Sequence, residues 1–318
     1  MTDFKMREIP NESGKPDPAY EFQFIQTMDL DPTDFNKKDK MHESVLFKAC
    51  SFGDVEALKK LIGLAAERNR YINPNTTNKF GMTPLIVACA YGHSEVVELL
   101  IKNWGRELLV NEIDMVDKSA LVYACENEDK KVVELLTVLE NLKLSMVYDE
   151  GETTLHILLK NESFELVKLI LDLNVELPLN VLDSGNNTPL SLACEAKSVE
   201  MVTLLLEDIR VDPNFNCRNQ QTVLHLLCGY LNKYFDEEIF KLFLDSERVD
   251  VNLQDADGHT PFMIACIYGN KEAAALLYNE ERVDCTILNK EGLTAFTIAK
   301  INGHSKMLIE IVEEKMGF

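Results

Sequence analysis

Cysteine and histidine are the residue types in this sequence that could bind a metal, form disulfides or act as nucleophiles. The 318 residues include eight cysteines and six histidines, with no C-x-x-C pair. Six cysteines recur at one position of a repeated phrase, at Cys50, Cys89, Cys125, Cys194, Cys228 and Cys266. Residues in the same place of successive stacked units lie too far apart for a disulfide bond. We therefore expect these six to be small apolar packing groups, and Cys217 and Cys285 to be surface thiols.

The histidines do not form a catalytic or metal-binding set. They are scattered along the chain, at His42, His93, His156, His225, His259 and His304. The sequence also contains no H-E-x-x-H pair, no Walker A loop and no G-x-S-x-G elbow. It therefore predicts no enzyme, and no metal or cofactor.

A phrase that returns along the chain explains the regular placing of the cysteines. TPLIVAC begins at Thr83, and TPFMIAC begins at Thr260. Eight variants of this phrase begin at residues 44, 83, 119, 153, 188, 222, 260 and 294, at intervals of 34 to 39 residues. A reaction centre is normally needed once, whereas a period of this length indicates a repeated structural unit.

Each copy of the phrase has the pattern of a short helix followed by a second helix. Thr83 can cap the first exposed amides, and Pro84 occupies the first turn, where a missing N–H has no cost. Leu85, Ala88 and Cys89 then fall on one helical face. Gly92 can end this helix in a left-handed conformation. A longer helical pattern such as SEVVELLIKN follows, and a turn such as NKFGM precedes each copy.

On these motifs the chain resembles the ankyrin-repeat family over about residues 39–318. The specific motifs are D-x-x-G-x-T-P at 255–261, G-H-x-E-V-V at 92–97 and VDVN at 249–252. The resemblance implies an all-α solenoid of about eight helix-turn-helix units with β-hairpin fingers, and binding of partners along its concave side. It places the repeat starts near residues 39, 78, 114, 148, 183, 217, 255 and 289. It also implies a hydrogen-bonded structural role for His156 and His225, which occupy the family's T-P-L-H position.

Several departures from the repeat are expected to have local structural effects. Repeats 3, 4 and 5 have Glu128, Glu162 and Lys197 where other repeats have the turn glycine. The insertion GYLNKYFDEEIF predicts a longer loop in repeat 6, and the spacer after repeat 1 predicts an extended second helix. Residues 1–38 do not fit the repeat and are expected to form a flexible or capping lead, with a short helix near YEFQFIQTM.

The charge of the chain limits the kinds of partner that it can attract. The sequence has 53 acidic and 32 basic side chains, a formal net charge of −21, and no segregated basic stripe. We therefore expect no nucleic acid and no membrane surface as a partner, and a basic protein is favoured. The alternative is that the acidity only maintains solubility. No apolar stretch long enough to span a membrane and no signal peptide are present, which predicts a cytoplasmic protein, with the nucleus as an alternative, and a monomer.

By analogy with the family, partner contacts are expected on the fingers and at the ends of the first helices. The aromatic candidates at helix ends are Phe52, Tyr91, Tyr230 and Tyr268, with Phe80 and Met82 on a finger. The acidic candidates are Asp117, Glu126, Asp149, Glu150 and Glu152, which would favour a Lys/Arg-rich segment. The alternatives are that each ring packs only on its neighbour and that the carboxylates form a solvated face.

The function that follows is non-catalytic protein recognition by an adaptor or scaffold. A regulatory inhibitor that masks a basic segment of its partner is the near alternative, and it differs in abolishing the partner's activity. A pathogen effector and an accessory subunit of an enzyme are less favoured alternatives. An enzyme would require a cluster of titratable groups in one pocket.

Overall fold

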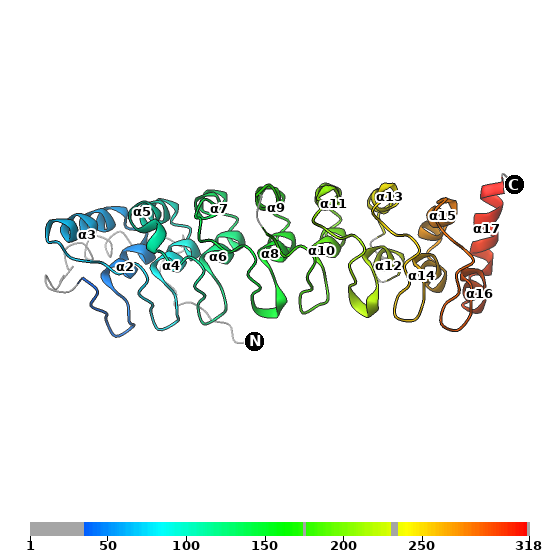
Figure 1. The fold of residues 1–318 in the computed structure, drawn as a ribbon, viewed down its shortest axis with the longest axis horizontal. Coiled ribbons are helices and arrows are strands. Elements are labelled where there is room, and N and C mark those ends of the chain that lie inside the picture. Colours follow the sequence, from blue (N-terminus) through cyan, green and yellow to red (C-terminus); the bar gives the residue numbers. More distant parts are fainter. Residues whose placement is uncertain (1–34, 174–175, 230–234, 317–318) are drawn as a thin grey trace, which may run out of the picture. The chain divides into compact units, whose positions relative to one another are not determined.

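The computed structural model describes residues 35–173, 176–229 and 235–316. Throughout this part of the chain each repeat is a short inner helix followed by a longer outer helix, and a finger precedes the inner helix (Figure 1). The described residues contain no β-strand, which confirms the all-α prediction. The predicted helix near YEFQFIQTM lies outside the described residues.

The first compact unit ends at Lys143. Its inner helices are α2 (Val45–Phe52), α4 (Pro84–Ala90) and α6 (Ala120–Glu126). Its outer helices are α3 (Val55–Glu67), α5 (Ser94–Trp104), followed by the 3-10 turn η1 (Gly105–Glu107), and α7 (Lys130–Thr137). Within the unit, each inner helix packs on the next inner helix and on its own outer helix. The 13 residues of α3 confirm the predicted extension of the second helix in repeat 1.

The second compact unit begins at Leu144. Its inner helices are α8 (Thr154–Lys160), α10 (Pro189–Glu195), α12 (Val223–Cys228), α14 (Pro261–Tyr268) and α16 (Ala295–Ile301). Its outer helices are α9 (Phe164–Leu171), α11 (Val199–Glu207), α13 (Glu237–Asp245), α15 (Lys271–Asn279) and α17 (Ser305–Met316). Two fingers contain 3-10 turns, η2 (Asp149–Gly151) and η3 (Arg218–Gln220). The predicted longer loop of repeat 6 falls largely on residues 230–234, outside the described part.

The start of each inner helix is fixed by its cap. The hydroxyl oxygen of Thr83 accepts the amide of Ile86, and that of Thr260 accepts the amide of Met263. A cap of this kind contributes about 1 kcal/mol to the stability of a helix. Pro84 then occupies the first turn, as the sequence predicts.

The turn between the helices of a pair requires a left-handed residue. Gly92 and Gly269 supply it with φ of 70° and 65°. Glu128, Glu162 and Lys197 adopt the same conformation, with φ of 54°, 55° and 54°. These three residues therefore keep the repeat geometry at a steric cost of about 1 kcal/mol each, because their side chains crowd the backbone in this conformation.

Each finger is closed by one backbone hydrogen bond between its first and fifth residues. In each finger the amide of the first residue donates to the carbonyl oxygen of the fifth, at 2.7 to 3.1 Å. The pairs are Asp39–Glu43, Asn78–Met82, Asp114–Lys118, Tyr148–Glu152, Asp183–Asn187, Cys217–Gln221, Asp255–His259 and Asn289–Leu293. At Asn78 the side-chain Oδ1 also accepts the amides of residues 80 and 82. Tyr148 and Cys217 have no such side-chain oxygen, and their fingers contain the turns η2 and η3.

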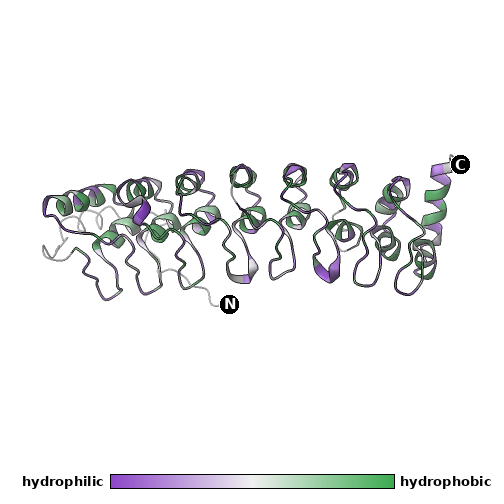
Figure 2. Ribbon diagram, in the orientation of Figure 1, coloured by the Kyte–Doolittle hydropathy of each residue, from purple (hydrophilic) through white to green (hydrophobic). Residues whose placement is uncertain are grey.

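The core of both units lies between the inner and outer helices. The hydropathy colours show hydrophobic residues concentrated on the helices, whereas η2 and η3 are hydrophilic (Figure 2). All six cysteines of the repeated phrase are buried, which confirms that they are packing groups. Cys217 is also buried, at 6% exposure, so the prediction of a surface thiol was wrong there. The reason is its place as the first residue of a finger, which is the end that faces the helices. Among the described residues, no helix is both long and apolar enough to cross a membrane.

Candidate partner-binding surface

The inner helices and the fingers form the surface on which partner contacts were predicted, and in the first unit it carries two exposed rings. Tyr91 caps the end of α4 and is 39% exposed, with its ring stacked on His93 at a centroid distance of 6.0 Å. Phe80, in the preceding finger, is 38% exposed. Phe52, the last residue of α2, and Met82 are half-buried. Tyr91 and Phe80 are therefore the predicted residues that offer a partner most apolar surface in this unit.

Asn127 occupies the same position in repeat 3 as Tyr91 in repeat 2, but it has a structural role. Its Nδ2 donates to the carbonyl oxygens of Cys89 and Ala90 at 3.1 and 3.0 Å. The side chain thereby adds a hydrogen bond to two carbonyls at the end of α4, of which that of Cys89 also accepts the amide of Gly92. This position therefore ties two repeats together.

One acidic candidate of the first unit, Glu126 at the end of α6, is paired with a lysine of the preceding finger. The Nζ of Lys118 lies 2.6 Å from Oε1 of Glu126 and 5.5 Å from the centre of the Tyr123 ring. The Tyr123 hydroxyl in turn donates to Oδ2 of Asp114 at 2.7 Å. Asp117, at the left-handed position of this finger with φ of 60°, is half-buried. A basic partner would have to exchange with Lys118 in order to reach Glu126.

Glu152, an acidic candidate of the second unit, shows the same arrangement with the charges reversed. Oε1 of Glu152 lies 2.5 Å from Nζ of Lys160, which is also 3.0 Å from Oδ2 of Asp183. Although partial burial opposes it, hydrogen bonding to these two carboxylates raises the pKa of Lys160. Glu150 is exposed at the tip of the finger with φ of 60°. The side chain of Asp149 lies outside the described part of the structure.

Sequence reasoning missed these two lysines, although a signal was present. In each pair the finger residue and the helix residue are eight positions apart, with Lys118 opposite Glu126 and Glu152 opposite Lys160. The fifth finger residue thus faces the last turn of the inner helix. Opposite charges at this spacing would have predicted both ion pairs.

Tyr268 is the exposed aromatic candidate of the second unit. It is the last residue of α14 and is 56% exposed. Tyr230, the other aromatic candidate, lies outside the described residues.

The histidines of the T-P-L-H position are buried parts of the helix caps. His156 and His225 have no exposed surface, and Nδ1 of each lies 2.8 or 2.9 Å from the hydroxyl of Thr153 or Thr222. Their Nε2 atoms lie 3.2 and 3.0 Å from carbonyl oxygens of the next finger. Burial lowers the pKa of both histidines. Both have the structural role that the resemblance implies.

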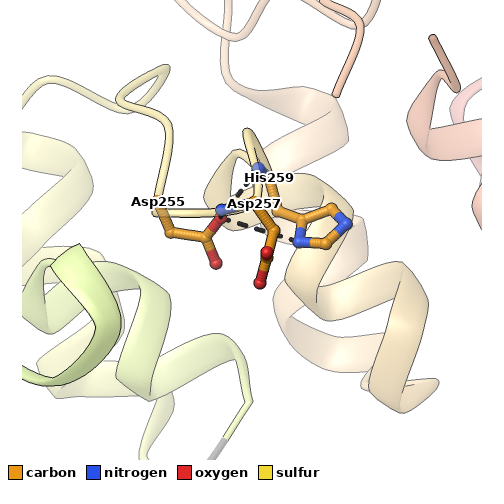
Figure 3. Close-up of side chains that lie close together, drawn as sticks. All are labelled: Asp255, Asp257 and His259. Carbon is orange, nitrogen blue, oxygen red and sulfur yellow. Dashed lines mark hydrogen bonds and ion pairs between the residues drawn. The ribbon is translucent and has the colours of Figure 1, made fainter. Parts of the chain in front are cut away.

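Asp255, Asp257 and His259 are gathered in one finger, with one potential ligand atom of each within 4.8 Å of the others (Figure 3). The position of Asp255 has a structural explanation, because its Oδ1 accepts the amides of Asp257 and His259 at 2.9 Å. Its Oδ2 accepts from Nε2 of Gln221 at 3.1 Å, and Nε2 of His259 lies 3.2 Å from Nδ2 of Asn289. Asp255 and His259 therefore form the hydrogen-bonded base of a finger, and Asp257 lies at its tip.

Comparison with known proteins agrees with this geometry. A model of ankyrin repeats, in three copies, matches residues 22–111, 46–144, 121–217, 155–233 and 224–317. The human transient receptor potential cation channel subfamily A member 1 is 32% identical over 136 residues, 42% of this chain and 12% of that protein. The chicken nuclear factor NF-kappa-B p105 subunit is 29% identical over 178 residues, 55% of this chain and 18% of that protein. The chain thus spans less than a fifth of the length of these relatives.

A solved structure shows the same fold. The ankyrin repeat domain of Bcl-3, a member of the IkappaB protein family, superposes with a TM-score of 0.61 and 23% identity. The superposition covers 74% of this chain and 99% of that domain. Ankyrin repeats are protein–protein interaction modules, and the matched segments run through most of this sequence. The chain belongs to the ankyrin-repeat family.

Proposed function

We propose that this chain is a non-catalytic adaptor or scaffold whose repeat domain, residues 39–318, binds a basic partner protein along its inner helices and fingers. The observation that carries the proposal is the exposure of Tyr91 and Tyr268, at 39% and 56%. Both end the inner helix of their repeat, one in each unit. Large rings that combine an apolar body with a polar tip are the usual anchors of a protein interface.

The basic character of the partner is supported by the charge of the whole chain. An excess of 53 acidic over 32 basic side chains creates a field that accelerates encounter with a Lys/Arg-rich surface. The ion pairs of Glu126 and Glu152 with lysines are exposed enough to exchange, because surface pairs contribute only about 0–1 kcal/mol. Affinity should therefore fall as salt is added.

We also propose a monomer in the cytoplasm, with the nucleus as the alternative. The eight cysteines are free thiols, as is typical of proteins from reducing compartments.

The test is to place a photo-crosslinking amino acid at Tyr91 or at Tyr268 and to identify what each position captures in cells. Ile209, which is 86% exposed on an outer loop, is the matched control position. We expect one protein with a basic segment to be captured from both tyrosine positions and not from Ile209. Capture from Ile209 alone would contradict binding at the inner helices.

The captured protein then allows the affinity to be measured. Tyr91→Ser and Tyr268→Ser should each weaken binding about tenfold or more, because truncating an interface anchor costs about 2 kcal/mol. Ile209→Ser should bind as the unaltered chain does. If the partner has an activity of its own, its loss on binding would identify the inhibitor alternative.

A further inference from the structure

The fingertips of the first unit expose large apolar side chains. Met41, Phe80, Met115 and Val116, here called the fingertip row, are exposed to 38%, 38%, 74% and 52%. They come from all three fingers of the unit. Met115 and Val116 were not among the residues predicted to contact a partner, and they are the most exposed of the set. Apolar side chains concentrated in this way on a surface typically mark an interaction site.

The fold holds the fingertip row in a fixed order. The carbonyl of Met41 accepts the amide of Lys79 at 3.1 Å, and the carbonyl of Phe80 accepts the amide of Met115 at 2.9 Å. Backbone hydrogen bonds thus join each fingertip to the next. The first residue of the third finger, Asp114, also uses its side-chain Oδ1 to accept the amides of Val116 and Lys118 at 3.0 Å. The apolar side chains are therefore carried on a braced backbone, so little ordering entropy is lost when a partner binds.

The second unit serves as an internal comparison. Within the five residues of each of its fingers, as far as the structure describes them, no large hydrophobic side chain is exposed, although Val147 and Leu288, directly before two of these fingers, are 54% and 53% exposed. The fingertip row is therefore a property of one unit, and the repeat architecture does not by itself require it.

The charges at the fingertips differ between the units in the same way. Taken together, the central three residues of the three fingers in the first unit include two lysines, Lys40 and Lys79, and one carboxylate, Asp117. Both lysines are exposed, and each directly precedes an apolar residue of the row. The corresponding positions of the second unit carry four carboxylates and two basic residues. In a chain of net charge −21, two exposed lysines thus stand at the fingertip row, although Asp39, Glu43 and Asp114 at the ends of these fingers are acidic.

We propose that the fingertip row is a docking site for an acidic, apolar segment of a partner protein. Apolar side chains of the segment would cover Met115 and Val116, while its carboxylates would pair with Lys40 and Lys79. This chemistry is opposite in charge to that proposed for the inner helices, so the two surfaces select different segments. The site shares the fingers, and Phe80, with the surface proposed above, but it can be tested separately because it uses neither Tyr91 nor Tyr268.

The experiment is a selection from a random peptide library displayed on phage, with the full chain as bait. We expect the selected peptides to combine Asp or Glu with Leu, Ile or Phe. Selection on the Met115→Ser/Val116→Ser variant should lose these sequences. The matched control is Val138→Ser, which removes a 73% exposed apolar side chain of the same unit away from the fingers. Circular dichroism establishes that the variants remain folded.

A synthetic copy of the selected peptide then separates the contributions by fluorescence anisotropy. Met115→Ser/Val116→Ser and Lys40→Glu/Lys79→Glu should each weaken its binding about tenfold. Lys60→Glu/Lys102→Glu, which reverses two exposed charges on outer helices, should have little effect. Binding that survives in Tyr91→Ser and Tyr268→Ser would keep this site distinct from the inner helices.

Three outcomes would overturn the proposal. The selected peptides could be basic, the fingertip variant could select the same sequences, or no peptide could be enriched over the phage background. Single-stranded RNA and phosphatidylserine vesicles test the other ligands that two exposed lysines could bind. If either bound through Lys40 and Lys79 without needing Met115 and Val116, the lysines would be assigned to phosphate groups.

Discussion

The Nδ2 atom of Asn214 donates to the carbonyl oxygen of Arg248, 2.8 Å away in the next repeat. Its Oδ1 atom accepts the amide of Asp250 at 2.9 Å. One side chain thus satisfies a carbonyl and an amide of the neighbouring loop at the same time. Asn180 and Asn252 make the same two bonds to the repeats that follow them. These asparagines couple successive repeats on the outer side of the second unit, where each repeat depends on its neighbours for stability.

Replacing Asn214 should therefore weaken the second unit. Asn214→Ala removes two hydrogen bonds, each with a net contribution of about 1 kcal/mol, so we expect a loss of about 2 kcal/mol in the free energy of unfolding. Urea denaturation followed by circular dichroism measures the loss. Asn216→Ala is the control, because Asn216 is exposed and makes no hydrogen bond within the described residues. Equal effects of the two substitutions would show that the two hydrogen bonds of Asn214 contribute nothing to stability.

A left-handed residue in repeat 4 offers a stabilising substitution. Glu162 is exposed with φ of 55°, at the turn where other repeats have glycine. Glu162→Gly should raise the free energy of unfolding by about 0.5–1 kcal/mol, because relief of the crowding exceeds the greater freedom of glycine in the unfolded chain. The neighbouring Asn161→Gly should lower it by a similar amount, since Asn161 has φ of −88°. The two thermal midpoints of unfolding should therefore move in opposite directions. A shift of both in one direction would show that the left-handed conformation of Glu162 is not strained.

The left-handed turns also show how far the sequence predicts this fold. A period of 34 to 39 residues, the Thr caps and the turn glycines suffice for the helix pairs, because each signal lies within one repeat. Glu128, Glu162 and Lys197 could be placed because the repeat showed which position must be left-handed. The prediction that Cys217 is exposed was wrong because its burial depends on the finger to which it belongs.

The candidate surface was harder to predict because exposure and ion pairing depend on contacts outside one helix. The ring at Tyr91 could be identified from its position in the repeat. The pairing of Glu126 with Lys118 follows from a finger folding back on the end of its own helix. The position of Met115 beside Phe80 depends on a hydrogen bond between two fingers, which no single repeat encodes.

The reactivity of the cysteines tests the packing of the whole array. Cys285 is the one cysteine with intermediate exposure, whereas the other seven are buried. Burial also raises the pKa of the buried thiols, to about 12 for Cys266, so little thiolate forms on them. We expect iodoacetamide to label the native chain only at Cys285, and all eight cysteines after denaturation in urea. Mass spectrometry of the labelled peptides measures this, and Cys285→Ser should abolish native labelling. Labelling of Cys217 in the native chain would contradict its burial.

The stability of the second unit should depend on pH through its two buried histidines. Nε2–H of His225 donates to the carbonyl of His259, and Nδ1 accepts from the Thr222 hydroxyl, so the ring is held neutral. Burial lowers the pKa of His225 and of His156 below the ordinary value of 6.5, although Asp255 and Asp183 lie nearby and favour the charged form. As the pH falls below 6.5, the unfolded chain binds protons that the native chain does not, and the free energy of unfolding decreases.

The His156→Gln/His225→Gln variant isolates this effect, because the carboxylates titrate alike in both chains and cancel in the comparison. Each histidine contributes about 1 kcal/mol of destabilisation per pH unit once the pH is below 6.5 and above the native pKa. Between pH 7.5 and 5.5 the unaltered chain should therefore lose about 2 kcal/mol more than the variant, as measured by urea denaturation. His42→Gln, at an exposed fingertip histidine, should keep the full pH dependence. If the free energy of unfolding of the double variant changes with pH as steeply as that of the unaltered chain, protonation of His156 and His225 does not limit the stability of the second unit.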